Sequence, residues 1–383
     1  MRKVTVLQVL RGSGSFGGVA SFLLSRYSLM DKNKIEFSFL FCQEDCLKDS
    51  IYLDKVGKNN VFELKALKYE NGLNEYKELY SKLVIFLSYH KFDFIHINTG
   101  SLPVTYVCLK AANKVGANNI IAHSHSSNYM NGQLNTNLLF RPIKKYIQWS
   151  IYKNSQYHFA CSDMAAKNMF GNRQYTFVCN SIDVKKFDYD RNKRIEIRTN
   201  FDITNEKVYG YVGRLSSSKN LVFLLNIFKN IKIIEPEAKL WIVGEGEDRG
   251  NIEKMILREA LSDSVVMFGN RNDVNELMQA MDIIIFPSLY EGLSLTVIEA
   301  QVAGLPIYMS DTLSKEHKIT DLVNFISLNE DSNTWAERII NDNSLRTSKI
   351  NEIIKCGYDL KDSVKWFEDF YENAKTHIKR GDL

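Results

Sequence analysis

The sequence predicts an α/β protein built from two Rossmann-like domains. Short apolar runs, typical of buried strands, alternate with amphipathic stretches, typical of helices, through residues 1–186, and the pattern restarts in residues 187–361. Continuous apolar runs indicate parallel strands covered on both faces, and their alternation with helices favours doubly wound sheets. Because such sheets bind ligands beyond the carboxyl ends of their strands, we expect the two domains to face each other across a ligand cleft.

The expected elements follow from the apolar pattern. In the first domain we expect strands at Val4–Leu10, Glu36–Cys42, Phe92–Ile97, Ile120–His123 and Tyr157–Cys161. In the second domain we expect strands at Lys207–Val212, Lys239–Val243, Val265–Gly269, Ile283–Phe286 and Pro306–Met309. The boundary is expected near the charged stretch Lys185–Arg194. An amphipathic helix is expected over Asp362–Ile378, and the segment 362–383 can pack back on the first domain.

Composition and charge narrow the possible classes of protein. Apolar residues make up 45% of the 383 residues, and no apolar run approaches the length of a membrane-spanning helix. The six cysteines are scattered without metal-site spacing, so we expect a cytoplasmic protein without a metal centre. The net charge is only +4, yet no Asp or Glu occurs between Phe94 and Ser162. This stretch predicts an anionic partner, either a membrane surface or a phosphorylated substrate, and not a nucleic acid; a merely basic surface is the alternative.

The most informative segment is Phe286–Gly304, with the sequence FPSLYEGLSLTVIEAQVAG. A buried strand leads to Glu291, and Ser294 is expected to cap a helix that stops at Gly304. A helix N-terminus that follows a glycine exposes backbone N–H groups, which suit a diphosphate or a sugar hydroxyl. Glu291 can face a sugar, and Glu299, one turn into the helix, can reach a ribose diol. An ordinary glutamate of the first helical turn is the alternative for Glu299.

This segment resembles the signature of retaining glycosyltransferase family 4. The resemblance rests on two glutamates eight residues apart, with PS before them and EAQVAGLP from the second one onward. It implies the two-domain arrangement called GT-B, with Glu291 beside the donor sugar and Glu299 on the ribose. It also implies backbone contacts to sugar and phosphate from Gly292, Leu293, Ser294 and Leu295. Ser294 stands where the family often has glycine.

A cationic loop follows the first expected strand of the second domain. Arg214 and Lys219 lie five residues apart in GRLSSSKN, where an arginine can hold phosphate oxygens with two hydrogen bonds and a lysine can supply a point charge. The pair resembles the cations with which the family neutralises the donor diphosphate. We therefore expect a transfer that needs no metal and no cofactor, with the nucleotide sugar as substrate. Two solvated loop cations are the alternative.

A glycine-rich loop follows the first strand of the chain. Gly12, Gly14 and Gly17 fit G-x-G-x-x-G, but dinucleotide binding also requires an acidic residue at the end of the second strand, which here ends in Phe41-Cys42-Gln43. The loop is more similar to the family's first loop, and the resemblance implies that Gly17 and Gly18 let the backbone approach the donor diphosphate. Ala20 occupies a position where many members carry Glu.

Two further loops complete the expected site. In the segment AHSHSS, His125 lies at the carboxyl end of a strand, and the resemblance implies that it contacts a hydroxyl of the donor sugar; a structural histidine is the alternative. His123 lies deeper in the strand, and His96 is expected to be structural. Arg271 belongs to GNRNDV, which resembles the family loop that borders the nucleobase.

The segment Arg141–Lys153, RPIKKYIQWSIYK, predicts a basic amphipathic helix that carries aromatic residues. Helices of this type lie on anionic membranes, so peripheral binding to the inner face of the cell membrane is one reading. A packed helix with a solvated basic edge is the other.

The function expected from these motifs is transfer of a hexosyl unit, with retention, from a UDP- or similar sugar to a saccharide or lipid-diphosphate-linked acceptor in bacterial surface polysaccharide synthesis. The resemblance implies front-face attack, with the leaving diphosphate accepting the acceptor's proton. The alternatives are a nicotinamide-dependent oxidoreductase that uses the glycine loop, a non-catalytic nucleotide-sugar-binding protein, and an epimerase or phosphorylase of the same fold.

Overall fold

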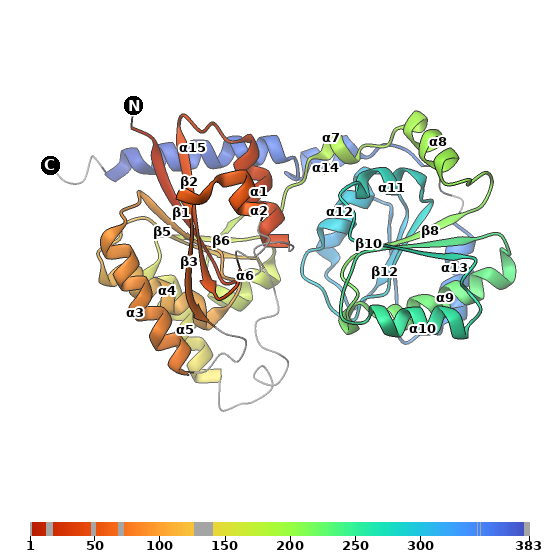
Figure 1. The fold of residues 1–383 in the computed structure, drawn as a ribbon, viewed down its shortest axis with the longest axis horizontal. Coiled ribbons are helices and arrows are strands. Elements are labelled where there is room, and N and C mark those ends of the chain that lie inside the picture. The colour runs from red at the N-terminus through yellow and green to blue at the C-terminus, as the bar shows by residue number, and fades with distance from the viewer. Residues whose placement is uncertain are drawn as a thin grey trace. The chain divides into compact units, whose positions relative to one another are not determined.

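The computed structural model describes residues 2–12, 18–46, 51–67, 73–125, 141–342, 344 and 346–378. The chain forms two compact units, which are described separately. Unit 1 comprises Met1–Ser181 together with Leu360–Leu383, and unit 2 comprises Ile182–Asp359 (Figure 1). The division precedes the boundary expected at residue 186, because the short helix α7 (Val184–Phe187) packs on helices of unit 2.

Unit 1 contains a parallel sheet of seven strands in the order β3-β2-β1-β4-β5-β6-β7. All the strands expected from the sequence are present. The strands are β1 (Val4–Leu10), β2 (Ile35–Gln43), β3 (Val61–Leu67), β4 (Phe94–Ile97), β5 (Ile120–Ser124), β6 (Tyr157–Ala160) and β7 (Thr176–Phe177). The strand order reverses between β1 and β4, where Gln8 pairs with His96. A ligand site is expected beyond the carboxyl ends at such a reversal.

The two faces of this sheet carry separate apolar clusters, which explains the continuous apolar runs. Leu7 and Val9 of β1 pack on one face, while Val6 and Leu10 pack on the other. Each face is covered by helices, because alternate side chains of a strand point to opposite sides. The helices of unit 1 are α1 (Gly18–Leu29), α2 (Ile51–Val56), α3 (Leu73–Tyr89), α4 (Leu102–Lys114), α5 (Arg141–Asn154), α6 (Asp163–Phe170) and α15 (Leu360–Ile378).

Unit 2 repeats the architecture with a parallel sheet of six strands in the order β10-β9-β8-β11-β12-β13. The strands are β8 (Val208–Val212), β9 (Lys239–Val243), β10 (Val265–Gly269), β11 (Ile283–Phe286), β12 (Ile307–Ser310) and β13 (Val323–Ile326). Besides α7, the helices are α8 (Arg191–Asn200), α9 (Leu221–Ile234), α10 (Arg249–Arg258), α11 (Val274–Ala280), α12 (Leu295–Val302), α13 (Ser332–Ile340) and α14 (Ile350–Lys355). The order reverses between β8 and β11, so the loops after these two strands lie at the switch point.

The last helix, α15, returns to unit 1 and packs beside α1 and β1 (Figure 1). Its Tyr371 is fully buried, with the hydroxyl 2.8 Å from His96 Nδ1 and 3.4 Å from Gln8 Nε2. The guanidinium of Arg26, on α1, donates to the hydroxyl of Ser363 at 2.8 Å. The packing that the sequence left open for the tail is therefore set by polar contacts inside unit 1.

We predict that Tyr371→Phe lowers the free energy of unfolding by about 1–3 kcal/mol, because it leaves the buried imidazole of His96 and the amide of Gln8 without their shared partner. Urea titration monitored by circular dichroism measures the difference. Tyr89→Phe is the matched control, because the Tyr89 side chain is exposed and the same loss of a hydroxyl should leave the midpoint unchanged. Equal midpoints for Tyr371→Phe and wild type would contradict the argument.

Candidate active site

The loops after β8 and β9 pack backbone against backbone. The amide of Gly213 donates to Val243 O at 2.9 Å, and the amide of Leu215 donates to Glu245 O at 2.9 Å. A Cβ atom on Gly244, whose φ is +136°, would lie 2.0 Å from the Gly213 carbonyl oxygen. Any side chain there would separate the loops, so this glycine is required by the packing of the loop that carries Arg214 and Lys219.

Lys219 is brought to Glu291 by contacts between the loops after β8 and β11. The amide of Leu289 donates to Ser218 O at 2.8 Å, and Asn220 Nδ2 donates to Pro287 O at 3.2 Å. Lys219 then forms an ion pair with the carboxylate of Glu291, and only 13% of its side chain is exposed. Burial lowers the pKa of Lys219 to about 8. Two residues that the sequence places 72 positions apart thus form one charged pair at the switch point.

Arg214 does not join this pair. Its side chain is 71% exposed and forms an ion pair of 3.1 Å with Glu247, which is also exposed. An exposed arginine takes the nearest carboxylate, and such surface pairs contribute little to stability. The guanidinium can therefore leave Glu247 at small cost, whereas Lys219 is held in a buried pair.

Glu299 lies in α12 as a half-buried carboxyl group. Burial raises its pKa to about 7, and the charge of Lys186 on α7 opposes the shift. No ion pair to Glu299 is present among the described residues. A carboxyl group that is desolvated without a salt bridge is costly for the fold and is typical of a binding or catalytic site.

Arg271 extends the same end of unit 2. Its Nε donates to Asp273 Oδ1 at 2.8 Å, and this contact lowers the pKa of Asp273. Lys186 also acts on Asp273, as it does on Glu299, so both carboxyl groups lie near one exposed lysine. The loop expected to border a nucleobase and the glutamate expected to hold a ribose thus both feel the charge of Lys186.

The start of α12 differs from the expectation. Ser294 occupies the N-cap position, but its side chain makes no capping hydrogen bond. Its backbone N–H, expected to be free for a ligand, donates to Nε2 of the buried His317 at 3.0 Å. In this structure the amide is therefore occupied by a side chain from the loop after β12, and its contact to a ligand stays a prediction. The helix does stop before Gly304, whose φ of +68° fits its predicted terminal role.

His125 lies directly after β5 in unit 1 and is almost fully buried. Its Nε2 is 2.8 Å from Asn98 Oδ1, which can only accept, so Nε2 carries the hydrogen. Burial, and next the charge of Arg26, lowers the pKa of His125 to about 3. Asn180 lies beside the ring, but Nδ1 has no hydrogen-bond partner among the described residues. The neutral ring therefore presents a lone pair that can accept a hydroxyl hydrogen.

His96 and His123 are structural in their contacts. Their rings share a hydrogen bond of 3.0 Å between His96 Nε2 and His123 Nδ1 inside the sheet. Burial holds the pKa of both well below the usual value.

The glycine loop can be followed only in part. Gly17 lies outside the described residues, and Gly18 is the first residue of α1. Gly12 is described, and a Cβ atom there would lie 2.2 Å from the Gln43 side chain at the end of β2. The neutral amide of Gln43 stands where a dinucleotide-binding fold needs a carboxylate.

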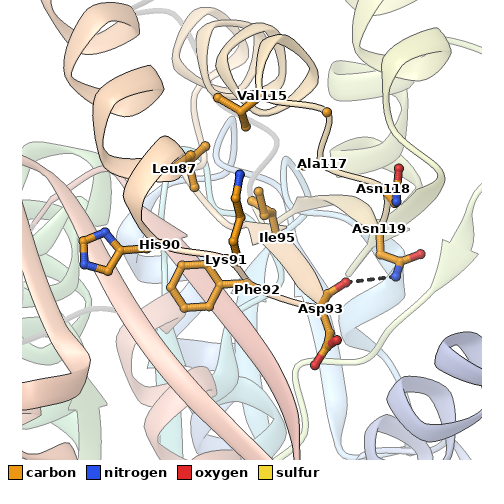
Figure 2. A pocket seen from close by; sticks show the side chains of 11 residues that line it. Leu87, His90, Lys91, Phe92, Asp93, Ile95, Val115, Ala117, Asn118 and Asn119 are labelled. Carbon is orange, nitrogen blue, oxygen red and sulfur yellow. Dashed lines mark hydrogen bonds between the residues drawn. The ribbon is translucent and has the colours of Figure 1, made fainter.

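A cavity of about 300 Å³ in unit 1 lies away from these loops. Figure 2 shows its lining, which comes from the end of α3, the start of β4 and the residues just before β4 and β5. Its one carboxylate, Asp93, already accepts from the backbone and side chain of Thr5, at 2.9 and 3.1 Å. The cavity therefore lies at the amino ends of the strands, whereas His125 lies at their carboxyl ends.

Comparison with known proteins agrees with this arrangement. Residues 193–352 match the family of glycosyl transferases group 1. Residues 193–352 are a group 1 glycosyltransferase domain. The domain contains Arg214, Lys219, Arg271, Glu291 and Glu299, and the chain is a glycosyltransferase. Its assignment to the retaining family 4 stays a prediction, and the oxidoreductase alternative is not favoured.

Relatives of the glycosyltransferase extend the likeness over the whole chain. EpsF of Bacillus subtilis (strain 168) is 28% identical over 379 residues, 94% of each chain. The Escherichia coli UDP-Gal:alpha-D-GlcNAc-diphosphoundecaprenol alpha-1,3-galactosyltransferase is 33% identical over 110 residues, 28% of each chain. Among solved structures, Anabaena HepE in complex with UDP and glucose has a TM-score of 0.71 at 15% identity, covering 96% of this chain and 99% of its own. The predicted fold class is confirmed by this match.

We predict that Glu299→Gln makes the glycosyltransferase more stable at about pH 8 by about 1–2 kcal/mol. The folded pKa of about 7 lies above the ordinary value of 4.5, so the folded state binds the extra proton between these values. The stability linked to Glu299 is therefore present at low pH and lost as the pH rises through about 7. Urea midpoints at several pH values measure this. Glu196→Gln, at an exposed site on α8, is the control, and identical profiles for both variants would refute the buried-carboxyl argument.

Proposed function

We propose that the glycosyltransferase moves a hexosyl unit from a UDP-sugar, with retention at the anomeric carbon, to a saccharide or lipid-diphosphate-linked saccharide in bacterial surface polysaccharide synthesis. The observation that carries the proposal is the ion pair of Lys219 and Glu291 at the switch point of unit 2. A buried cation beside a carboxylate suits a reaction that separates a diphosphate anion from a sugar that becomes cationic.

The charges of unit 2 can be assigned to the parts of such a donor. Lys219 would neutralise the diphosphate as it leaves. Arg214 would do so as well, after its guanidinium exchanges Glu247 for the diphosphate. Glu291, released from Lys219 by the incoming phosphate, would stand beside the sugar. Glu299 and the loop of Arg271 would hold the nucleoside. The two cations supply the positive field that a metal ion often provides, so we expect turnover without a divalent metal.

The identity of donor and acceptor is supported by the named relatives. HepE has been solved with UDP and glucose, and the E. coli relative is named for a UDP-galactose donor and a diphosphoundecaprenol-linked acceptor. CapM of Staphylococcus aureus, named for capsular polysaccharide biosynthesis, is 30% identical over 170 residues, 43% of this chain and 44% of its own. These names favour a UDP donor and a lipid-linked acceptor for the present chain.

A lipid-linked acceptor fits the surface of α5. Ile143, Tyr146 and Trp149 follow one another every three residues and are each about half exposed, and Lys153 Nζ lies 5.0 Å from the centre of the Trp149 ring. Gln148 and Ile151 form the buried side of the helix. None of the described helices is both long and apolar enough to cross a bilayer. We therefore propose peripheral binding through α5.

The donor assignment predicts that UDP and a matching UDP-sugar raise the melting temperature of the wild type by roughly 5 °C at about a hundredfold excess over Kd. Lys219→Met should weaken UDP binding by about tenfold or more, because it removes a charge-assisted contact worth about 1.5–3 kcal/mol. Differential scanning fluorimetry against a panel of nucleotide sugars measures both.

Lys229→Met is the control for this experiment, because Lys229 is an exposed lysine of α9 paired with Glu259. It should bind UDP as the wild type does. Normal UDP binding by Lys219→Met would remove Lys219 from the diphosphate site, and stabilisation by another nucleotide alone would replace UDP in the proposal.

The membrane assignment predicts that the wild type co-sediments with anionic vesicles at low salt and is released as salt rises. Changing Arg141, Lys145 and Lys153 to Ser should reduce vesicle affinity by roughly a hundredfold, since each cation near an anionic surface contributes about 1 kcal/mol. A variant with Lys254, Lys355 and Lys361 changed to Ser removes the same charge elsewhere and should still bind. Equal sedimentation of the two variants would exclude α5 as the membrane surface.

A further inference from the structure

The side chain of His317 forms a hydrogen bond with the backbone at the amino end of α12. It ends a short 3₁₀ helix, η4 (Lys315–His317), which follows β12, and its side chain is fully buried. Nε2 lies 3.0 Å from the amide nitrogen of Ser294, and Nδ1 lies 2.8 Å from the carbonyl oxygen of Ser314. An amide can only donate and a carbonyl can only accept. The ring is therefore neutral, with its hydrogen on Nδ1 and a lone pair on Nε2.

The segment that carries His317 is itself tied to α12. Gln301, one of the fully buried residues of that helix, donates from Nε2 to His317 O at 2.9 Å. Its Oε1 accepts from the amides of Ile319 and Thr320, at 3.1 and 2.9 Å. Helix α12 thus fixes the segment that carries the imidazole, and the imidazole in turn accepts a hydrogen bond from the Ser294 amide at the start of α12. Ser294 can move relative to α12 only by breaking a buried hydrogen bond.

We propose that His317 is a positioning residue of the donor site, which fixes the backbone of Gly292–Ser294 by accepting the Ser294 amide through Nε2. This inference rests on the proposed function, because the family resemblance implies that this backbone contacts the sugar and phosphate of the donor. One consequence is that the Ser294 amide is not a ligand contact. A second is that Glu291, which directly precedes the held segment, is presented to Lys219 from a fixed loop.

The contact also makes the loop sensitive to pH. Protonation would put a hydrogen on Nε2, facing the Ser294 N–H, so the acceptor would be lost. Burial lowers the pKa of His317; the Ser314 and Gly292 carbonyls and the carboxylate of Glu316 raise it, and the charge of Lys219 lowers it further. The folded pKa thus lies below the ordinary value of 6.5, so the contact persists at neutral pH and is lost only as the pH falls through this lowered pKa.

Two substitutions separate the acceptor from the bulk of the side chain. His317→Gln can place a carbonyl oxygen near the position of Nε2, whereas the shorter His317→Asn reaches only the position of Nδ1. We expect the backbone amides of residues 292–296 to exchange with solvent roughly 2- to 10-fold faster in His317→Asn, as for the loss of one hydrogen bond, and as slowly as wild type in His317→Gln. Hydrogen exchange on the full-length, ligand-free protein measures this.

A pH series supplies the readout that a purely structural role would not change. Wild-type exchange at 292–296 should accelerate as the pH falls through this lowered pKa, after correction for the intrinsic rate, whereas His317→Gln should show no such step. His158→Gln, a half-buried histidine of unit 1 with a similarly lowered pKa, is the control and should keep the wild-type step. Nitrogen-15 shifts of labelled histidine should show the Nδ1–H tautomer for His317 in the wild type.

The outcomes are distinct. Unchanged exchange in His317→Asn, equal acceleration in both variants, or an Nε2–H tautomer would each overturn the proposal. If His317→Asn does not fold, the His317→Gln profile and the wild-type tautomer still decide it. Calorimetric titration with UDP separates the two proposals. If the wild type shows slow exchange at residues 292–296 but binds no UDP, the proposed donor is refuted and the role of His317 in positioning the loop is retained.

Discussion

The arrangement of the loops after β8 and β11 in unit 2 depends on one buried ion pair, that of Lys219 and Glu291. Neither charged side chain would be stable in this partly buried position alone, because burying an unpaired charge has a large desolvation penalty. The pair is possible only because the loops after β8 and β11 are joined by backbone hydrogen bonds at Ser218 and Leu289. Those loops meet because the strand order reverses between the same two strands. Topology therefore brings the charges together, and burial sets their chemistry, as the lowered pKa of Lys219 records.

Burial acts in the same direction in unit 1, where it lowers the pKa of the buried basic groups. Arg26 is an almost fully buried cation among three histidines, and its pKa is lowered to about 9 by desolvation. The histidines stay neutral because burial and this neighbouring charge both oppose protonation. A neutral His125 accepts or donates single hydrogen bonds, which suits a sugar hydroxyl better than a phosphate. Unit 2 therefore carries the charged pair of Lys219 and Glu291 after its strands, and unit 1 carries the neutral His125 after β5.

Strands differ in how strongly their sequence marks them. Strands in the middle of a sheet are covered on both faces, so β1, β4, β8 and β11 appear as apolar runs and were predicted closely. The edge strands β3, β7 and β13 were not predicted from the sequence, whereas the edge strand β10 was. Both residues of β7, Thr176 and Phe177, are exposed, and β3 contains Glu63 and Lys65. Polar residues in such strands interrupt the apolar signal.

Sequence by itself determined the alternation of strands and helices, the spacing of Glu291 and Glu299, and the positions of Arg214 and Lys219 after a strand, because these are local patterns of side-chain chemistry. Tertiary structure alone decided which of these groups meet. It paired Lys219 with Glu291, left Arg214 on Glu247, packed α15 on unit 1 and placed His317 under Ser294. No local pattern marks His317, since its role comes from a hydrogen bond between segments 23 residues apart in sequence, and that contact exists only after β11 and β12 lie side by side.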